Sequence, residues 1–405
     1  MSLDVGVVGC GTAGAAVALF LARAGHEVTV YERVPEPGPV GAGILLQPTG
    51  QAVLARLGLL DEVRAQGSPI DRLWCRRRNG KTLVDLHYAE IGDGVGLGLG
   101  IHRGVLFQAL FRALRAEPRA ALRLGTSIES LDGLGHDLVV LADGAESAAQ
   151  RVPALGARSR GYPWGALWFV ARDPARAIRS HLHQVVDGAH TLLGLLPTGL
   201  APGTGEPVVS LFWSIRCDAV DAWRAGDLDA WKRRVLELEP LAAPVLDQIR
   251  APGDLLFARY ADVRLRRWHG ERVVVLGDAA HATSPQLGQG ANLALWDAMV
   301  LADHLATPGR GIGAALAAYS AARRAHIRYY QLAARWLTPF FQSDSRVGGW
   351  LRDRAMPLAM RVGPLRRMMI ETMAGVRRGV VRRSMRLSLP AQGSDFREGA
   401  SPRDA

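Results

Sequence analysis

The sequence has few of the features that mark membrane-spanning, disulfide-rich or metal-binding proteins. It contains 3 cysteines, Cys10, Cys75 and Cys217, and an odd, widely spaced set fits a reducing compartment better than a disulfide framework or a zinc site. No run of transmembrane length is free of charge, since the apolar segment 15–22 is stopped by Arg23. The first residues lack a basic region and a cleavage site. We therefore expect a cytoplasmic protein without a signal peptide.

Lysine is almost absent, occurring only at Lys81 and Lys232, and the formal net charge is +11. Most of the positive excess lies in segment 346–386, which is rich in arginine, while the rest of the chain is close to neutral. The preference for arginine over lysine is best explained by the base composition of the genome. The positive charge is therefore no evidence for nucleic-acid binding, and we expect no nucleic-acid partner. The basic, partly apolar tail could touch an anionic membrane surface, but packing on the body of the protein is the favoured interpretation.

The N-terminus has the pattern of a dinucleotide-binding unit. An apolar strand, 4–9, leads into GCGTAG, then into a helix pattern at 15–24 and a second strand, 27–31. The three glycines allow a tight turn, close approach to a pyrophosphate and helix–strand packing, and the following acid can bind ribose hydroxyls. Arg33 could stack on the adenine or lie on the surface. The predicted cofactor-binding residues of this unit are Gly9, Gly11, Thr12, Ala13, Gly14, Glu32 and Arg33.

Two further apolar strands end in acidic turns. Segment 138–141 is followed closely by Asp143. Segment 273–276 leads into GDAAHATSPQLGQGAN, which contains Asp278. The carboxyl ends of neighbouring strands in an open α/β sheet face one crevice, so we expect these turns and the first glycine turn to converge on one ligand. In the last turn the glycines allow close approach to the ligand, and Asn292 can cap the helix that follows.

Between residues 151 and 269 the sequence changes to strands rich in tryptophan and phenylalanine. Trp168, Phe212 and Trp213 could line an aromatic substrate pocket, with core packing as the alternative. His181 and His183 share one strand face but lack a neighbouring cluster of acids or cysteines, so we expect no metal site.

The fold class expected is α/β with α+β insertions: a Rossmann-like nucleotide-binding domain, a β-rich substrate domain and a C-terminal helical tail. The predicted boundaries are 1–160 and 270–337 for the discontinuous first domain with edge strands near 64–100, 161–269 for the second, 338–390 for the basic tail and 391–405 for a disordered end.

The three motifs, in this order, resemble those of the single-component FAD-dependent aromatic hydroxylases, flavoprotein monooxygenases related to p-hydroxybenzoate hydroxylase and the ubiquinone-pathway hydroxylases. The resemblance covers about residues 4–337. It implies that Asp143 serves FAD and that Asp278 holds the ribityl chain. It also implies that Pro285 and Gln47 lie near the flavin ring and Arg103 near a phosphate. The family usually carries an arginine where this chain has Gln150, so the role of that position is in doubt.

The resemblance implies that NADPH or NADH, bound transiently, reduces FAD, and that a flavin hydroperoxide formed with dioxygen hydroxylates a phenol-like or lipophilic ring. Backbone N–H groups at the last turn would stabilise the negative charge of the reduced flavin. The residues of this turn are Gly288, Gly290, Ala291 and Asn292. No general base is evident: His281 follows the motif, but a histidine satisfied at a helix start is the alternative.

Other functions fit parts of the pattern. A flavin-dependent reductase or dehydrogenase of the same fold would insert no oxygen, and an FAD-bound scaffold or redox sensor would show no turnover. A halogenase is disfavoured because its Trp-x-Trp-x-Ile signature and active-site lysine are missing. The sequence leaves open the identity of the substrate, the regiochemistry, the choice of NADH or NADPH and the oligomeric state.

Overall fold

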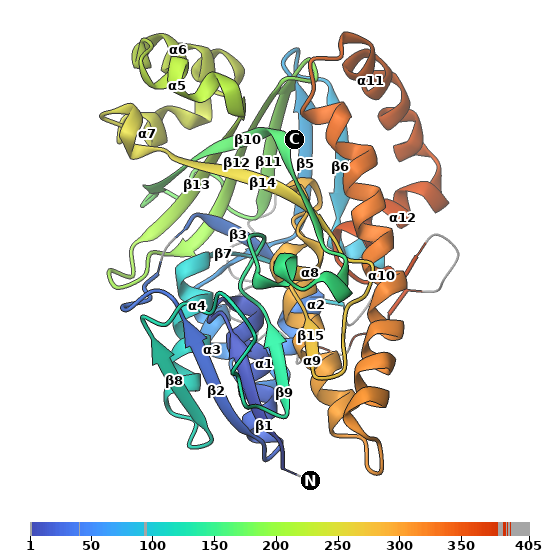
Figure 1. Cartoon of the computed structure of the whole chain (residues 1–405). Coiled ribbons are helices and arrows are strands. Elements are labelled where there is room, and N and C mark those ends of the chain that lie inside the picture. Colours follow the sequence, from blue (N-terminus) through green and yellow to red (C-terminus); the bar gives the residue numbers. More distant parts are fainter. Residues whose placement is uncertain are drawn as a thin grey trace.

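The computed structural model describes residues 2–39, 41–92, 95–379, 384–385, 387 and 389. Figure 1 shows a parallel sheet with its helices at one end of the molecule, a larger sheet at the other end and long C-terminal helices along one side. The predicted disordered segment, 391–405, lies outside the described residues.

A five-stranded sheet, with its strands in the order β15-β9-β1-β2-β8, forms the first layer, and every pairing in it is parallel. Apart from the exposed Asp4 at the start of β1, the central strands β1 and β9 are apolar and buried, as is typical of parallel strands covered on both faces. The strands are β1 (Asp4–Val8), β2 (Glu27–Glu32), β8 (Ala120–Leu124), β9 (Leu138–Leu141) and β15 (Val273–Val275). The helices of this part are α1 (Thr12–Arg23), α2 (Pro48–Arg56), α3 (Leu60–Ala65), α4 (Arg103–Arg115), α8 (Asp278–His281), α9 (Gly290–Leu305) and α10 (Ile312–Phe341).

A seven-stranded sheet, in the order β14-β10-β13-β12-β11-β5-β6, forms the second layer. It is antiparallel except for the pairing of β11 with β5. The edge strands expected near 64–100 are here β5 and β6, which extend this larger sheet. The strands are β5 (Arg72–Arg77), β6 (Thr82–His87), β10 (Arg158–Arg172), β11 (His181–Asp187), β12 (Thr191–Leu200), β13 (Pro207–Arg216) and β14 (Leu256–Arg264).

Helices α5 (Val220–Arg224), α6 (Leu228–Leu238) and α7 (Ala243–Leu246) cover one face of the second sheet (Figure 1). Successive side chains of a strand point to opposite faces. On β13, Leu211 and Trp213 pack in the core beneath these helices, so Ser210 and Phe212 point toward the other face. We call this other face, on which Ser210 Oγ accepts from the backbone N–H of Gly43, the inner face.

A small antiparallel sheet of β3 (Gly43–Leu46), β7 (Gly98–His102) and β4 (Ser68–Ile70) joins the two layers. The backbone N–H of Gly43 donates to Ser210 Oγ on the inner face at 2.9 Å. A Cβ atom at Gly100 would lie 2.0 Å from the carbonyl oxygen of Pro197, a distance that only glycine permits. The two layers are therefore in direct contact through this sheet.

The C-terminal helices α11 (Arg346–Arg361) and α12 (Gly363–Met373) follow α10 and contact β6. The buried Arg352 donates to the carbonyl of Phe340 at 2.8 Å, and Arg366 forms an ion pair with Glu90 at 2.6 Å. Within the part of the chain that the structure describes, no helix has the length and apolar character needed to cross a membrane.

Candidate functional site

Three turns meet at one edge of the parallel sheet. Because β9 pairs with both β1 and β15, their carboxyl ends are adjacent: the N–H of Ala142 donates to Val8 at 2.8 Å and that of Leu276 to Leu141 at 3.1 Å. A Cβ atom at Gly9 would lie 2.7 Å from the Ala142 oxygen. The predicted convergence of the three strand ends is therefore confirmed.

The glycines of the first turn have different tasks. A Cβ atom at Gly14 would lie 1.9 Å from the carbonyl oxygen of Gly9, so this glycine permits the close packing of α1 on the turn. A Cβ atom at Gly11 would meet nothing within 4 Å. The first-turn N–H groups of α1, at Thr12 and Ala13, have no intrahelical acceptor, and such groups favour an anion. The turn is thus packed tightly at Gly14 and open at Gly11, next to the unused N–H groups of Thr12 and Ala13.

Glu32 lies at the end of β2, beside this turn. Its carboxylate accepts from the N–H of Cys10 at 2.8 Å and from that of Val34 at 2.9 Å. Burial, reinforced by the Glu32 charge, raises the pKa of the Cys10 thiol to about 12, so the thiol is protonated near neutral pH. Arg33 is exposed. The acid is held in place by the backbone, whereas Arg33 extends into solvent.

At the second turn, one oxygen of Asp143 accepts from the N–H of Ala148 at 2.7 Å. Its other oxygen, Oδ1, is buried and has no hydrogen-bond partner among the described residues. A buried acceptor without a partner is costly, so this atom is suited to a ligand donor. Gln150 donates to the carbonyl of Ala145 at 2.6 Å, closing the turn, and Arg151 is exposed.

The third turn places Asp278 at the start of α8 with an exposed side chain. Gly288 adopts φ +60°, a conformation that favours glycine, and a Cβ atom there would meet nothing within 4 Å. Gly290 begins α9, and a Cβ atom on it would be 3.8 Å from Asp278 Oδ1. The acid and the free N–H groups of the first turn of α9 therefore face the same space. Pro285 begins the short 3₁₀ turn Pro285–Leu287 that precedes Gly288.

The prediction that Asn292 caps α9 is wrong. Gln289 occupies the cap position, and Asn292 lies in the first turn with its side chain buried. It accepts from the N–H of Gln47 at 2.8 Å and donates to the carbonyl of Leu45 at 3.1 Å. The physical reason is that the end of β3 leaves a buried donor and a buried acceptor that need partners. Asn292 supplies both and so fixes Gln47 beside the third turn.

Gln47 is fully buried, and its two polar atoms differ. The side-chain oxygen accepts from the hydroxyl of Tyr88 at 2.5 Å, and burial raises the pKa of Tyr88, which keeps this donor protonated. The amide nitrogen Nε2 has no partner among the described residues. With its oxygen engaged by Tyr88, Gln47 leaves Nε2 as a buried, unused donor.

A buried ionic network lies directly beneath the third turn. Asp297, fully buried on α9, accepts from the N–H of Gly277 at 3.0 Å, from His281 Nε2 at 2.5 Å and from Arg323 Nε at 2.6 Å. Burial alone would raise the pKa of Asp297, but His281 and Arg323 outweigh it and lower the pKa to about 2. Asp297 was not among the site residues predicted from the sequence. It could have been found as a single acid among the apolar residues of the helix pattern that follows the third turn.

His281 points into this core. Its ring stacks on Trp268 with 5.7 Å between centroids, and its Nε2 is engaged by Asp297. Of the two interpretations offered for His281, a residue near the flavin ring or a histidine with its hydrogen bonds made inside the protein, this geometry fits the second.

Arg103 is the first residue of α4 and is exposed. Its backbone N–H donates to the carbonyl of Ala42 at 3.1 Å, and its Cδ would lie 3.1 Å from a Cβ atom on Gly41. The aliphatic part of the Arg103 side chain therefore lies against the segment that precedes β3.

The predicted aromatic residues divide between the two faces of the second sheet. Trp168 and Phe212 are cross-strand partners on the inner face, with ring centroids 5.0 Å apart. Trp213 is buried on the opposite face and packs edge-on against Trp231 of α6, so its assignment to a substrate pocket is corrected to a core position. The reason is the two-residue alternation of a strand.

Tyr260 on β14 is an inner-face residue that the sequence did not reveal. Burial raises the pKa of Tyr260 to about 12, and the neighbouring side chain of Trp168 partly opposes this rise. Trp168, Phe212 and Tyr260 thus form an aromatic group that carries one neutral hydroxyl.

Hydrogen bonds connect the third turn to the second sheet. Gln286 donates to Gln342 at 2.9 Å, and Gln342 donates to the Gly165 carbonyl of β10 at 3.4 Å. The N–H of Val263 on β14 donates to the Ala282 carbonyl at 2.9 Å. The turn is therefore joined to both strands that carry Trp168 and Tyr260.

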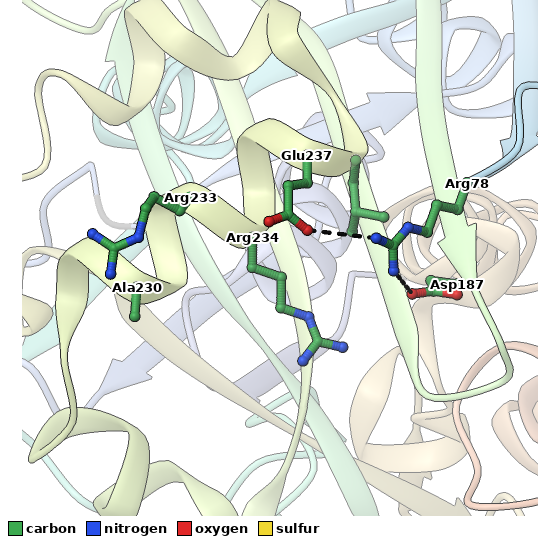
Figure 2. Close-up of a pocket in the computed structure, with 7 residues that line it drawn as sticks. Arg78, Asp187, Ala230, Arg233, Arg234 and Glu237 are labelled. Carbon is green, nitrogen blue, oxygen red and sulfur yellow. Dashed lines mark hydrogen bonds and ion pairs between the residues drawn. The ribbon is translucent and has the colours of Figure 1, made fainter.

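A hollow of about 390 Å³ lies elsewhere, between α6 and β11. Figure 2 shows Arg78 reaching Asp187 and Glu237, at 3.3 and 3.5 Å, with Arg234 nearby and Arg233 pointing away from them. These charges are exposed and partly paired on the outer surface, and the hollow contains none of the three turns.

The comparisons with known proteins agree with this geometry. The family described as FAD binding domain matches residues 2–132 and 117–331. Kynurenine 3-monooxygenase of Salinispora arenicola is 31% identical over 79% of this chain and 76% of its own length. Ubiquinone hydroxylase UbiL of Rhodospirillum rubrum is 28% identical over 92% of this chain and 89% of its own. A variant of Klebsiella pneumoniae HpxO complexed with FAD has a TM-score of 0.74 at 22% identity, covering 92% and 99% of the two chains. The chain therefore belongs to the FAD binding domain family and is an FAD-dependent monooxygenase.

Proposed function

We propose that FAD lies along the crevice formed by the three turns, with its adenosine end at Gly9–Glu32 and its ring end at Gly288–Asn292. The support is a set of unused groups that match the cofactor. These are the open space at Gly11 with free N–H groups behind it, the orphaned acceptor Asp143 Oδ1 and the orphaned donor Gln47 Nε2. When bound, FAD supplies a ring that accepts a hydride from NAD(P)H and activates dioxygen.

The chain's residues would place and stabilise this group. The first-turn N–H groups of α9 stabilise negative charge at the ring edge, and Gln47 Nε2 donates a further hydrogen bond there. Asp278 binds hydroxyl groups of the ribityl chain. The nicotinamide cofactor, NADPH or NADH, binds transiently. Buried Cys10 and Cys75, both unpaired, support a reducing, cytoplasmic location.

We propose that the substrate is a neutral, electron-rich ring compound bound between the flavin end of the crevice and the inner face. The observation that carries this proposal is the group of Trp168, Phe212 and Tyr260, which is aromatic and carries no charge at neutral pH. Stacking on such rings favours a planar apolar molecule, and the Tyr260 hydroxyl can orient a polar substituent. The name kynurenine 3-monooxygenase also refers to an aromatic substrate.

The test is a screen of phenolic and bicyclic aromatic compounds for stimulated NAD(P)H oxidation, followed by mass spectrometry of the product. A gain of one oxygen supports hydroxylation, whereas a gain of two hydrogens would show the reductase alternative. We expect Trp168→Ala and Tyr260→Phe to raise KM for the compound found, with flavin content unchanged. Trp223→Phe, on the helical side of the sheet, is the matched control. An unchanged KM in both inner-face variants would refute the proposed pocket.

A further inference from the structure

Helix α11 exposes the apolar stripe of an amphipathic helix. Val347, Trp350 and Leu358 are 73%, 55% and 60% exposed, and they recur at the three- and four-residue spacing of a single helix face. Leu351, 46% exposed, lies next to Trp350 and Leu358 on the same side of α11. A helix of a globular protein normally turns such a stripe toward the core, so the exposed stripe needs a partner.

The helix cannot roll over to bury this stripe, because its opposite side is fixed to the body. A Cβ atom at Gly349 would lie 3.1 Å from the backbone nitrogen of Ala189, which shows a close backbone approach. Arg352 is 2% exposed, donates to the Phe340 carbonyl and lies over the ring of Phe341. The orientation of the exposed stripe is therefore set by the fold.

Arginines lie among the apolar residues of the stripe. Arg346, Arg354 and Arg361 are exposed, and none of them forms an ion pair with an acid in the described part of the chain. The guanidinium of Arg354 lies 4.0 Å from the centre of the Trp350 ring. Asp353, the acid of this helix, faces inward to Arg352 and Arg77. The exposed face is thus apolar and cationic at once.

We propose that this face of α11, made of Val347, Trp350, Leu351 and Leu358 with Arg346, Arg354 and Arg361, binds the surface of an anionic phospholipid bilayer. Its apolar side chains enter the headgroup boundary, its tryptophan lies at the interface and its arginines contact lipid phosphates. A second copy of the chain fits less well, because pairing this face with itself would place unpaired arginines opposite one another.

The test is sedimentation of the full-length, FAD-loaded protein with vesicles of phosphatidylcholine alone or mixed with phosphatidylglycerol. We expect binding to the mixed vesicles only, weakened by salt, and falling roughly fivefold for each arginine replaced in R346Q, R354Q and R361Q. The combined W350S and L358S variant should also lose binding. The matched controls are Arg224→Gln and Leu241→Ser, exposed residues on the opposite side of the second sheet, which should bind like the parent.

Equal binding to both kinds of vesicle, or none, would overturn the proposal. So would concentration-dependent dimerisation that disappears in W350S while vesicle binding is absent, since that result assigns the face to a second copy. Flavin content, read from absorbance, checks that each variant is folded. Because sedimentation needs no turnover, this outcome is independent of the substrate proposal.

Discussion

The buried carboxylate of Asp297 is predicted to be the main electrostatic support of the third turn. In Asp297→Asn the shape is kept, but Arg323, whose side chain is 2% exposed, loses its counter-charge, and the amide cannot accept from all three donors. Removing one partner of a buried ion pair costs about 3–5 kcal/mol. We expect a loss of that size in the free energy of unfolding, together with weaker FAD binding, because the N–H of Gly277 is no longer held.

Asp303→Asn is the matched control for Asp297→Asn. It lies on the same helix, loses the same charge and also breaks a pair with an arginine, Arg56, but both side chains are about half exposed. Such a pair contributes about 0–1 kcal/mol. Urea unfolding of the apo-proteins and FAD titration would measure both effects. If Asp297→Asn is no more destabilising than Asp303→Asn, the argument from burial is wrong.

Four other changes separate cofactor, core and pH effects. Asp278→Ala should lose FAD, and stoichiometric flavin absorbance in that variant would contradict our assignment of the third turn. Gly11→Val should fold normally, since a Cβ atom at this position meets no protein atom within 4 Å, yet fail to retain FAD; a retained flavin would show that the space is not used. Trp213→Ala should cost about 3–5 kcal/mol of stability, as expected for a buried tryptophan, and a change in KM alone would argue against its core position. Burial and then Arg323 lower the pKa of His326 to about 3 from its ordinary 6.5, so only the unfolded state gains a proton as the pH falls through 6.5. His326 alone should therefore lower the stability by about 1.4 kcal/mol between about pH 7.5 and pH 5.5, and His326→Asn should make the measured decrease smaller by that amount in denaturant titrations.

The sequence predicted the three turns well because each is a local pattern. An apolar strand, a glycine and an acid within a few residues specify a strand end, and neighbouring parallel strands then bring these ends together. The hydrogen bonds of Asn292 could not be predicted from a local pattern, because its partners Leu45 and Gln47 lie about 245 positions away in the chain. Helix capping is a local pattern too, but here a distant strand end determined what the side chain does.

The aromatic residues show a second limit of the sequence. Alternation along β13 indicates that Phe212 and Trp213 face opposite ways, but which side is buried depends on where α5–α7 pack. Tyr260 gave no signal because its importance comes from its contact with Trp168 on another strand. Side-chain roles that arise from pairing between distant strands require the structure.

The position of β15 in the parallel sheet has a consequence for synthesis of the chain on the ribosome. Val140 of β9 pairs with Val274 of β15, so one side of β9 stays without its neighbour until the whole second sheet has been made. An unpaired strand edge of this apolar kind is prone to aggregate, and pairings so distant in sequence form slowly. We expect fragments that end before residue 273 to be insoluble and to bind no flavin. The two layers should therefore reach their final form in one late, cooperative step.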